Sequence, residues 1–139
     1  MSSNPPYKIL LVEDNAGDVK LVQEALRDVQ LRFELTHCET VKSAVQAISR
    51  YADGGIDIPD LILLDYNLPG GDARDVLKAA LANAALARTK KAVITSSLSP
   101  RDRDEALQSG AQYVLQKPAE LDSFLRHVGE AVVKLLGSE

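Results

Sequence analysis

Four polar motifs in this sequence follow apolar stretches and carry side chains that could do chemistry together. If three carboxylates meet, they repel one another, because two unit charges 4 Å apart cost about 4 kcal/mol at an effective dielectric constant near 20. A divalent cation would remove that cost, and a small set of oxygen ligands suits Mg²⁺. The motifs are Glu13-Asp14, Asp65 with Asn67, Thr95-Ser96 and Lys117-Pro118. The expected Mg²⁺ ligands are Glu13 (directly or through water), Asp14, Asp65 and the carbonyl of Asn67.

Asp65 is the candidate reactive group of this set. It ends LILLD, which is the most hydrophobic stretch of the chain, so a rigid buried strand would hold its carboxylate. An aspartate can carry a phosphoryl group as an acyl phosphate. Such transfer depends mostly on positioning and on charge neutralisation, which the ammonium of Lys117, the hydroxyl of Thr95 and a metal would supply. We therefore expect a phosphoryl acceptor at Asp65.

The elements that must position these motifs alternate along the chain. Apolar runs predict strands over 8–12, 33–38, 61–65, 91–96 and 111–116, with 33–38 nearer a sheet edge. Helical periodicity predicts helices after caps at Asp14-Asn15 and Thr40, over 73–87, from Ser99-Pro100 to Gly110, and over 120–136. Strands that alternate with helices imply an α/β fold with a doubly wound parallel sheet. The carboxyl ends of its strands then meet at one edge, where ligands bind.

The four motifs, in this order, resemble those of the receiver domain of two-component response regulators. In that CheY-like family an acidic pair ends the first strand, the phosphoacceptor ends the third, a hydroxyl residue ends the fourth and Lys-Pro ends the fifth. The match runs from VEDN (12–15) to the last helix, and Asp65 precedes Thr95 by 30 residues. The resemblance implies a flavodoxin-like (βα)5 fold with the five strands in the order 2-1-3-4-5.

The resemblance also implies a function. A sensor histidine kinase would phosphorylate Asp65 with Mg²⁺ as cofactor, and the protein would signal through a protein–protein surface. It would be no enzyme beyond its own phosphotransfer and autodephosphorylation. VEDNAGDVKLVQEAL and ITSS are similar to stand-alone receivers that pair with phytochrome-type kinases. We expect a tail over 1–6 and a single receiver domain over 7–139, with no DNA-binding output after the fifth helix.

Two positions depart from the family pattern. The family usually has glycine eight residues after the phosphoacceptor, where this chain has Ala73. The aromatic switch residue usually stands three residues before the lysine, where this chain has Val114, with Tyr113 beside it. Adjacent strand residues face opposite sides, so coupling between Tyr113 and Thr95 would need a bulge.

Composition excludes several other classes of protein. The 139 residues carry a net charge of −4 and no run of Lys or Arg, which argues against nucleic-acid binding. A single cysteine, Cys38, excludes an internal disulfide. No apolar run approaches 18 residues and no leader-like segment opens the chain, so we expect a cytoplasmic protein without a membrane anchor.

Taken alone, each residue could have a purely structural role. Asp14 could be a helix cap and Lys117 a solvated charge, and we interpret His37 and His127 as ordinary strand and helix residues. The apolar stripe of the last helix is core, or in part the seam of a homodimer, since Val133 lies outside it.

Three other functions remain open. They are a pseudo-receiver that binds without phosphorylation, a phosphatase with an aspartyl-phosphate nucleophile, and a flavin-binding module. The phosphatase is disfavoured because it needs a second acid where this chain has Asn67. The flavin-binding module is disfavoured because Glu13-Asp14 would repel the flavin phosphate.

Overall fold

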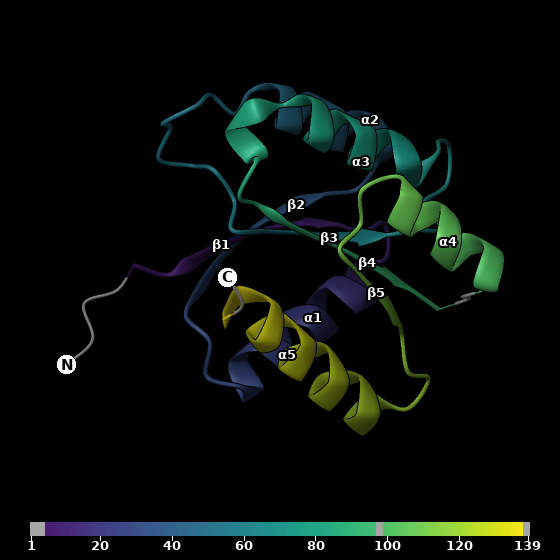
Figure 1. Ribbon diagram of the computed structural model, residues 1–139. Coiled ribbons are helices and arrows are strands. Elements are labelled where there is room, and N and C mark those ends of the chain that lie inside the picture. Colours follow the sequence, from purple (N-terminus) through teal and green to yellow (C-terminus); the bar gives the residue numbers. More distant parts are fainter. Residues whose placement is uncertain (1–4, 97–98, 138–139) are drawn as a thin grey trace.

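The computed structural model describes residues 5–96 and 99–137, and it has one parallel sheet between two layers of helices (Figure 1). The strand order is β2-β1-β3-β4-β5, as expected. Residues 1–4 of the predicted tail, Ser97 of the ITSS motif and residues 138–139 lie outside the described residues. The strands are β1 (Tyr7–Val12), β2 (Phe33–Cys38), β3 (Leu61–Asp65), β4 (Lys90–Thr95) and β5 (Tyr113–Gln116), so β5 is shorter than predicted.

The two faces of the sheet are covered by different helices. In Figure 1, α2 and α3 lie above the sheet and α1 and α5 lie below it. Alternate residues of β1 enter opposite cores: Leu10 packs with α2 and α3, and Leu11 packs with α1 and α5. The helices are α1 (Ala16–Asp28), α2 (Val41–Ser49), α3 (Ala73–Ala82), α4 (Pro100–Gln108) and α5 (Leu121–Gly137).

The helices begin where the sequence predicted. Asn15 caps α1 by accepting a hydrogen bond from Asp18 N, and Ser99 caps α4 with Pro100 in the first turn. Thr40 and Ser43 form a reciprocal capping box at α2. Because α1 starts four residues after β1 ends, its first turn lies at the same edge of the sheet as the strand ends.

The predicted helix over 73–87 is wrong in its last five residues. It ends at Ala82, and a separate 3-10 turn spans Ala84–Leu86. The cause is Asn83, which is extended and whose Nδ2 donates to the carbonyls of Ile48 (2.9 Å) and Tyr51 (3.1 Å). Its Oδ1 accepts from Ala85 N at 3.0 Å and starts the 3-10 turn. An asparagine that satisfies backbone groups in this way competes with the helix ladder.

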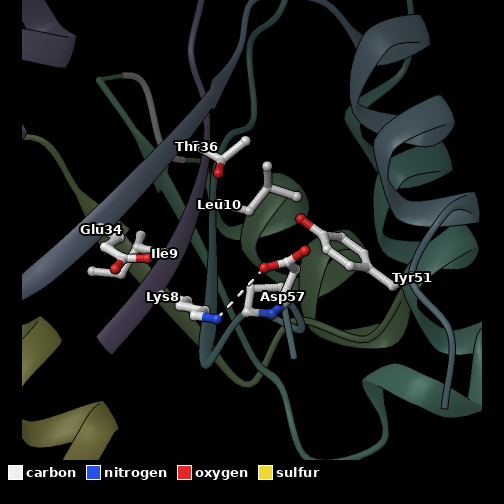
Figure 2. A pocket seen from close by; sticks show the side chains of 8 residues that line it. Lys8, Ile9, Leu10, Glu34, Thr36, Tyr51 and Asp57 are labelled. Carbon is white, nitrogen blue, oxygen red and sulfur yellow. Dashed lines mark ion pairs between the residues drawn. The ribbon is translucent and has the colours of Figure 1, made fainter. Parts of the chain in front are cut away.

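A small cavity of about 250 Å³ lies toward the amino-terminal end of β1, far from the strand ends that carry the polar motifs. Figure 2 shows Tyr51 reaching toward Asp57, and Lys8 paired with Asp57 at 3.6 Å. Lys8 Nζ also donates to the carbonyl of Ile56. None of the predicted site residues lines it. Within the described residues, no helix is both long and apolar enough to span a membrane.

Candidate functional site

The structure brings the predicted acidic residues together at the carboxyl edge of the sheet. Glu13 follows β1 and Asp65 ends β3. The two residues lie close together because these strands are paired in register from Ile9↔Leu61 to Val12↔Leu64. Glu13 is 1% exposed and Asp65 6% exposed, whereas Asp14 is exposed. One carboxylate oxygen from each of Glu13, Asp14 and Asp65 lies within 4.8 Å of the others.

Lys117 reaches into this acidic group from the end of β5. Its Nζ lies 2.7 Å from Glu13 Oε2, 2.8 Å from Asp18 Oδ2 and 3.6 Å from Asp65 Oδ2. The Lys117 backbone N–H donates to the carbonyl of Thr95 at 2.7 Å, so β4 fixes where the lysine leaves the sheet. With a side chain only 8% exposed, the ammonium is a nearly buried charge among three carboxylates.

Asn67 and Thr95 complete the neighbourhood of Asp65. The backbone N–H of Asn67 donates to Asp65 Oδ1 at 3.1 Å, which orients that carboxylate. The Asn67 side chain donates through Nδ2 to the hydroxyl of Thr95, which is fully buried. All six predicted site residues therefore lie at one place, and the side chain of Asn67 links the ends of β3 and β4.

The electrostatics of the site favour an added cation. Burial raises the pKa of Glu13 from 4.5 to about 7; hydrogen bonding and attraction from Lys117 oppose this rise, and Asp65 adds to it. For Lys117, burial lowers the pKa, but the hydrogen bonds that it donates to Asp18 and Glu13 outweigh this effect, so its pKa lies above its ordinary value. The single positive charge of Lys117 therefore cannot neutralise the carboxylates of Glu13, Asp18 and Asp65 together.

The donor set fits a hard divalent cation. Three carboxylates with oxygens within 4.8 Å of one another offer only oxygen ligands, which Mg²⁺ and Mn²⁺ accept. The backbone N–H bond from Asn67 to Asp65 holds the segment that would present the Asn67 carbonyl close to this group. In the part of the chain that the structure describes, this is the one such cluster of acidic, histidine and cysteine ligands.

Two residues at the site were not predicted from the sequence. Asp18, in the first turn of α1, is bonded to Lys117. His37, at the end of β2, donates from Nε2 to the carbonyl of Glu13 at 2.6 Å. A signal existed for Asp18: it stands three residues after the Asn15 cap, in a helix turn that must lie at the strand ends. For His37, its place just before the end of the edge strand was the only signal.

The structure also shows what the two departures from the family pattern do. Ala73 is the first residue of α3 and is not among the residues with positive φ; that conformation falls at Gly70, with φ 74°. On β5, Val114 is buried and Tyr113 is 37% exposed. The β4–β5 register is unbroken from Ala92↔Tyr113 to Thr95↔Gln116, so no bulge turns Tyr113 toward Thr95.

Comparison with known proteins gives the family. The family model of the response regulator receiver domain matches residues 9–129. This chain belongs to the response regulator receiver domain family. Its five parallel strands have the order that the resemblance implied. The predicted membership of the receiver domain family is thus confirmed.

Similar proteins include other response regulators, one of which is named as a phytochrome response regulator. Response regulator Rcp1 of Synechocystis is 34% identical over 127 residues, which is 91% of this chain and 86% of Rcp1. The phosphorylated cyanobacterial phytochrome response regulator RcpA has a TM-score of 0.85 and 29% identity, with 97% of each chain covered. The Mn²⁺-bound structure of Rcp1 has a TM-score of 0.82 and 30% identity, over 96% of this receiver domain and 97% of Rcp1.

Proposed function

We propose that this receiver domain accepts a phosphoryl group on Asp65 from a histidine kinase, in a Mg²⁺-dependent reaction, and signals through a protein–protein surface. The observation that carries the proposal is the buried carboxylate of Asp65, with Lys117 Nζ at 3.6 Å and two further carboxylates beside it. A carboxylate held this way is a nucleophile whose surroundings neutralise an incoming dianion.

Each residue has a role in this reaction. Asp65 Oδ attacks the phosphorus of a phosphohistidine, and the bond from phosphorus to the imidazole nitrogen breaks as the acyl phosphate forms. The ammonium of Lys117 and the hydroxyl of Thr95 pair with the phosphoryl oxygens. The bond from Asn67 N–H fixes the rotamer of Asp65, which leaves its other oxygen, the one nearer Lys117, for attack.

The residues that would hold Mg²⁺ are Asp14, Asp65 and the Asn67 carbonyl, with Glu13 as a ligand directly or through water. When bound, Mg²⁺ supplies neutralisation of the carboxylates and of the phosphoryl oxygens. Glu13 fits the indirect role because both of its oxygens already accept hydrogen bonds, Oε1 from Asn15 N and Oε2 from Lys117.

Phosphorylation would bias a pre-existing equilibrium between two local arrangements. A shift from 1:99 to 99:1 needs about 5.5 kcal/mol of differential stabilisation. Two or three charge-assisted hydrogen bonds at roughly 1.5–3 kcal/mol each approach that value. Because Tyr113 faces away from Thr95 in an unbroken strand pair, the readout would rely on Thr95 and Asn67 rather than on an aromatic switch.

The proposed partner is a sensor histidine kinase of the phytochrome type, which is supported by the similarity to Rcp1 and RcpA. A homodimer through α5 is also proposed. Leu121 and Val133 are 52% and 42% exposed on that helix, outside the stripe that packs on the core. A cytoplasmic location and the domain bounds 7–139 stay predictions.

Intact mass spectrometry tests the proposal. Incubation with acetyl phosphate and Mg²⁺ should add about 80 Da to the wild type, and omission of Mg²⁺ should abolish the gain. Asp65→Asn should show no gain. Asp75→Asn, which changes an exposed aspartate of α3, should react like the wild type. If neither acetyl phosphate nor a histidine kinase gives a gain, the protein is a pseudo-receiver, and turnover of p-nitrophenyl phosphate would instead identify a phosphatase.

A further inference from the structure

Asp18 is an acid at the site that the proposed reaction does not use. Its Oδ2 accepts a hydrogen bond from Lys117 Nζ at 2.8 Å, nearly as short as the 2.7 Å bond from Lys117 to Glu13. The Asp18 side chain is 29% exposed, whereas Lys117 is 8% exposed. The ion pair therefore joins a nearly buried ammonium to an acid at the rim of the site.

The position of Asp18 in α1 suggests a plainer role as half of a helix cap. Asn15 is the cap, and its Oδ1 accepts from Asp18 N at 3.0 Å. In a capping box, the side chain of the third helical residue would return a bond to the backbone N–H of the cap. That N–H instead donates to Glu13 Oε1 at 3.2 Å. The Asp18 carboxylate is thus directed to Lys117 and not to the cap.

The two hydrogen bonds of Lys117 leave its ammonium short of Asp65. An ammonium has three protons, and here two go to Glu13 and Asp18. The Nζ–Oδ2 separation from Asp65 is 3.6 Å, which is longer than a hydrogen bond. A phosphoryl group on Asp65 would draw the ammonium toward Asp65 and Glu13, and so away from Asp18, whose carboxylate is not among the three acids that lie within 4.8 Å of one another.

We propose that Asp18 is a positioning residue that holds Lys117 away from Asp65 in the unphosphorylated protein and competes with the phosphoryl group for it. This inference rests on the proposed phosphoryl transfer at Asp65. Of the two acids bonded to Lys117, Asp18 is the one that can leave, because Glu13 is enclosed. A cavity of about 330 Å³ lined by Asp18, Lys117 and Phe124 among others lies beside the pair and gives Asp18 room to move.

The test is a double-mutant cycle on the rate of mass gain from acetyl phosphate with Mg²⁺. Asp18→Asn should speed phosphorylation of Asp65 about tenfold, the order expected for one charge-assisted hydrogen bond that water screens. In a Lys117→Gln background, Asp18→Asn should change the slower rate by less than about twofold. An equal gain in both backgrounds would show general repulsion of the anion by Asp18 and would overturn the proposal.

Asp75→Asn is the matched control, because Asp75 is also three residues after a helix cap, Asp72, and is exposed. It corrects for the lost interaction between a first-turn acid and the helix dipole. The Asp75 variant should phosphorylate at the wild-type rate. A gain as large as that of Asp18→Asn would refute a role through Lys117.

A second readout separates this inference from the proposed function. In Asp18→Asn, Lys117 moves onto the acids that hold the cation, so the Mg²⁺ dissociation constant measured by calorimetry should rise. The rise should be at least about threefold larger with Lys117 present than in the Lys117→Gln background. If the wild type gains no mass, the proposed function fails, and this Mg²⁺ cycle still decides the Asp18–Lys117 coupling. If the wild type gains mass but both cycles show no coupling, only this inference fails.

Discussion

Glu13 should make the metal-free protein less stable as the pH rises. Burial, the largest effect, and the nearby Asp65 raise its pKa from 4.5 to about 7 against the opposing effect of Lys117. Between these two values the folded protein binds a proton that the unfolded chain has released. The free energy of unfolding therefore falls as the pH rises through this window. Glu13→Gln stays neutral and should lack this decline.

The magnitude follows from the two pKa values. A change from 4.5 to about 7 corresponds to about 3 kcal/mol. Because Glu13 is 1% exposed, water screens little of this. Between pH 4.5 and 7 the free energy of unfolding of the wild type should therefore fall by about 3 kcal/mol relative to that of Glu13→Gln. The pKa of Lys117 lies above 10.5, so that lysine does not titrate in this window.

The assay is urea unfolding followed by circular dichroism, with chelator present, at half-unit steps from about pH 4.5 to 7.5. Wild type and Glu13→Gln are compared at each pH. Saturating Mg²⁺ should flatten the wild-type curve, because a cation favours the ionised carboxylate. Parallel curves for the two proteins in chelator would refute the reasoning, since they would mean that Glu13 ionises alike in the folded and unfolded states.

Three substitutions test other parts of the structure by urea unfolding. Lys117→Met should destabilise the metal-free protein by about 3 kcal/mol, because it leaves buried carboxylates without their ammonium, and Mg²⁺ should recover most of the loss. Asn83→Ala should cost about 2 kcal/mol, because two carbonyls and the start of the 3-10 turn lose their hydrogen bonds. Gly71→Ala should cost about 2 kcal/mol, because its Cβ would lie 2.9 Å from that of Val41.

Lys78→Met is the control for the lysine variant, since Lys78 is exposed on α3 and should change stability by less than about 0.5 kcal/mol. A Lys117→Met protein as stable as this control would contradict a charge-neutralising role. An Asn83→Ala protein within about 0.5 kcal/mol of wild type would mean that α3 simply continues through that position.

The strand ends could be predicted because parallel sheets leave few choices. An apolar run such as LILLD, 61–65, can only be a buried strand here, and its last residue, Asp65, then lies at the edge where β1, β4 and β5 also end. Pairing of neighbouring parallel strands fixes which residues meet. The positions of Glu13, Asp14, Thr95 and Lys117 followed from this geometry.

What the sequence did not predict depends on side-chain partners that are distant along the chain. Asn83 ends α3 because it bonds to carbonyls more than 30 residues away, and its local context, AALANAALA, favours a helix. The pairing of Asp18 with Lys117 could not be predicted, since nothing in VEDNAGD indicates that the lysine 99 residues later points at it. Periodicity records which face of an element is buried, but not which polar groups pair across elements.

Locating the phosphoryl group on the chain tests transfer to Asp65 directly. After reaction with acetyl phosphate and Mg²⁺, borohydride reduces an aspartyl phosphate to homoserine, and peptide mass spectrometry then shows which residue carried it. The proposed site predicts homoserine at Asp65 and at no other aspartate or glutamate. Homoserine at Asp14 or elsewhere, or a stable phosphate that survives on a serine or threonine, would contradict it.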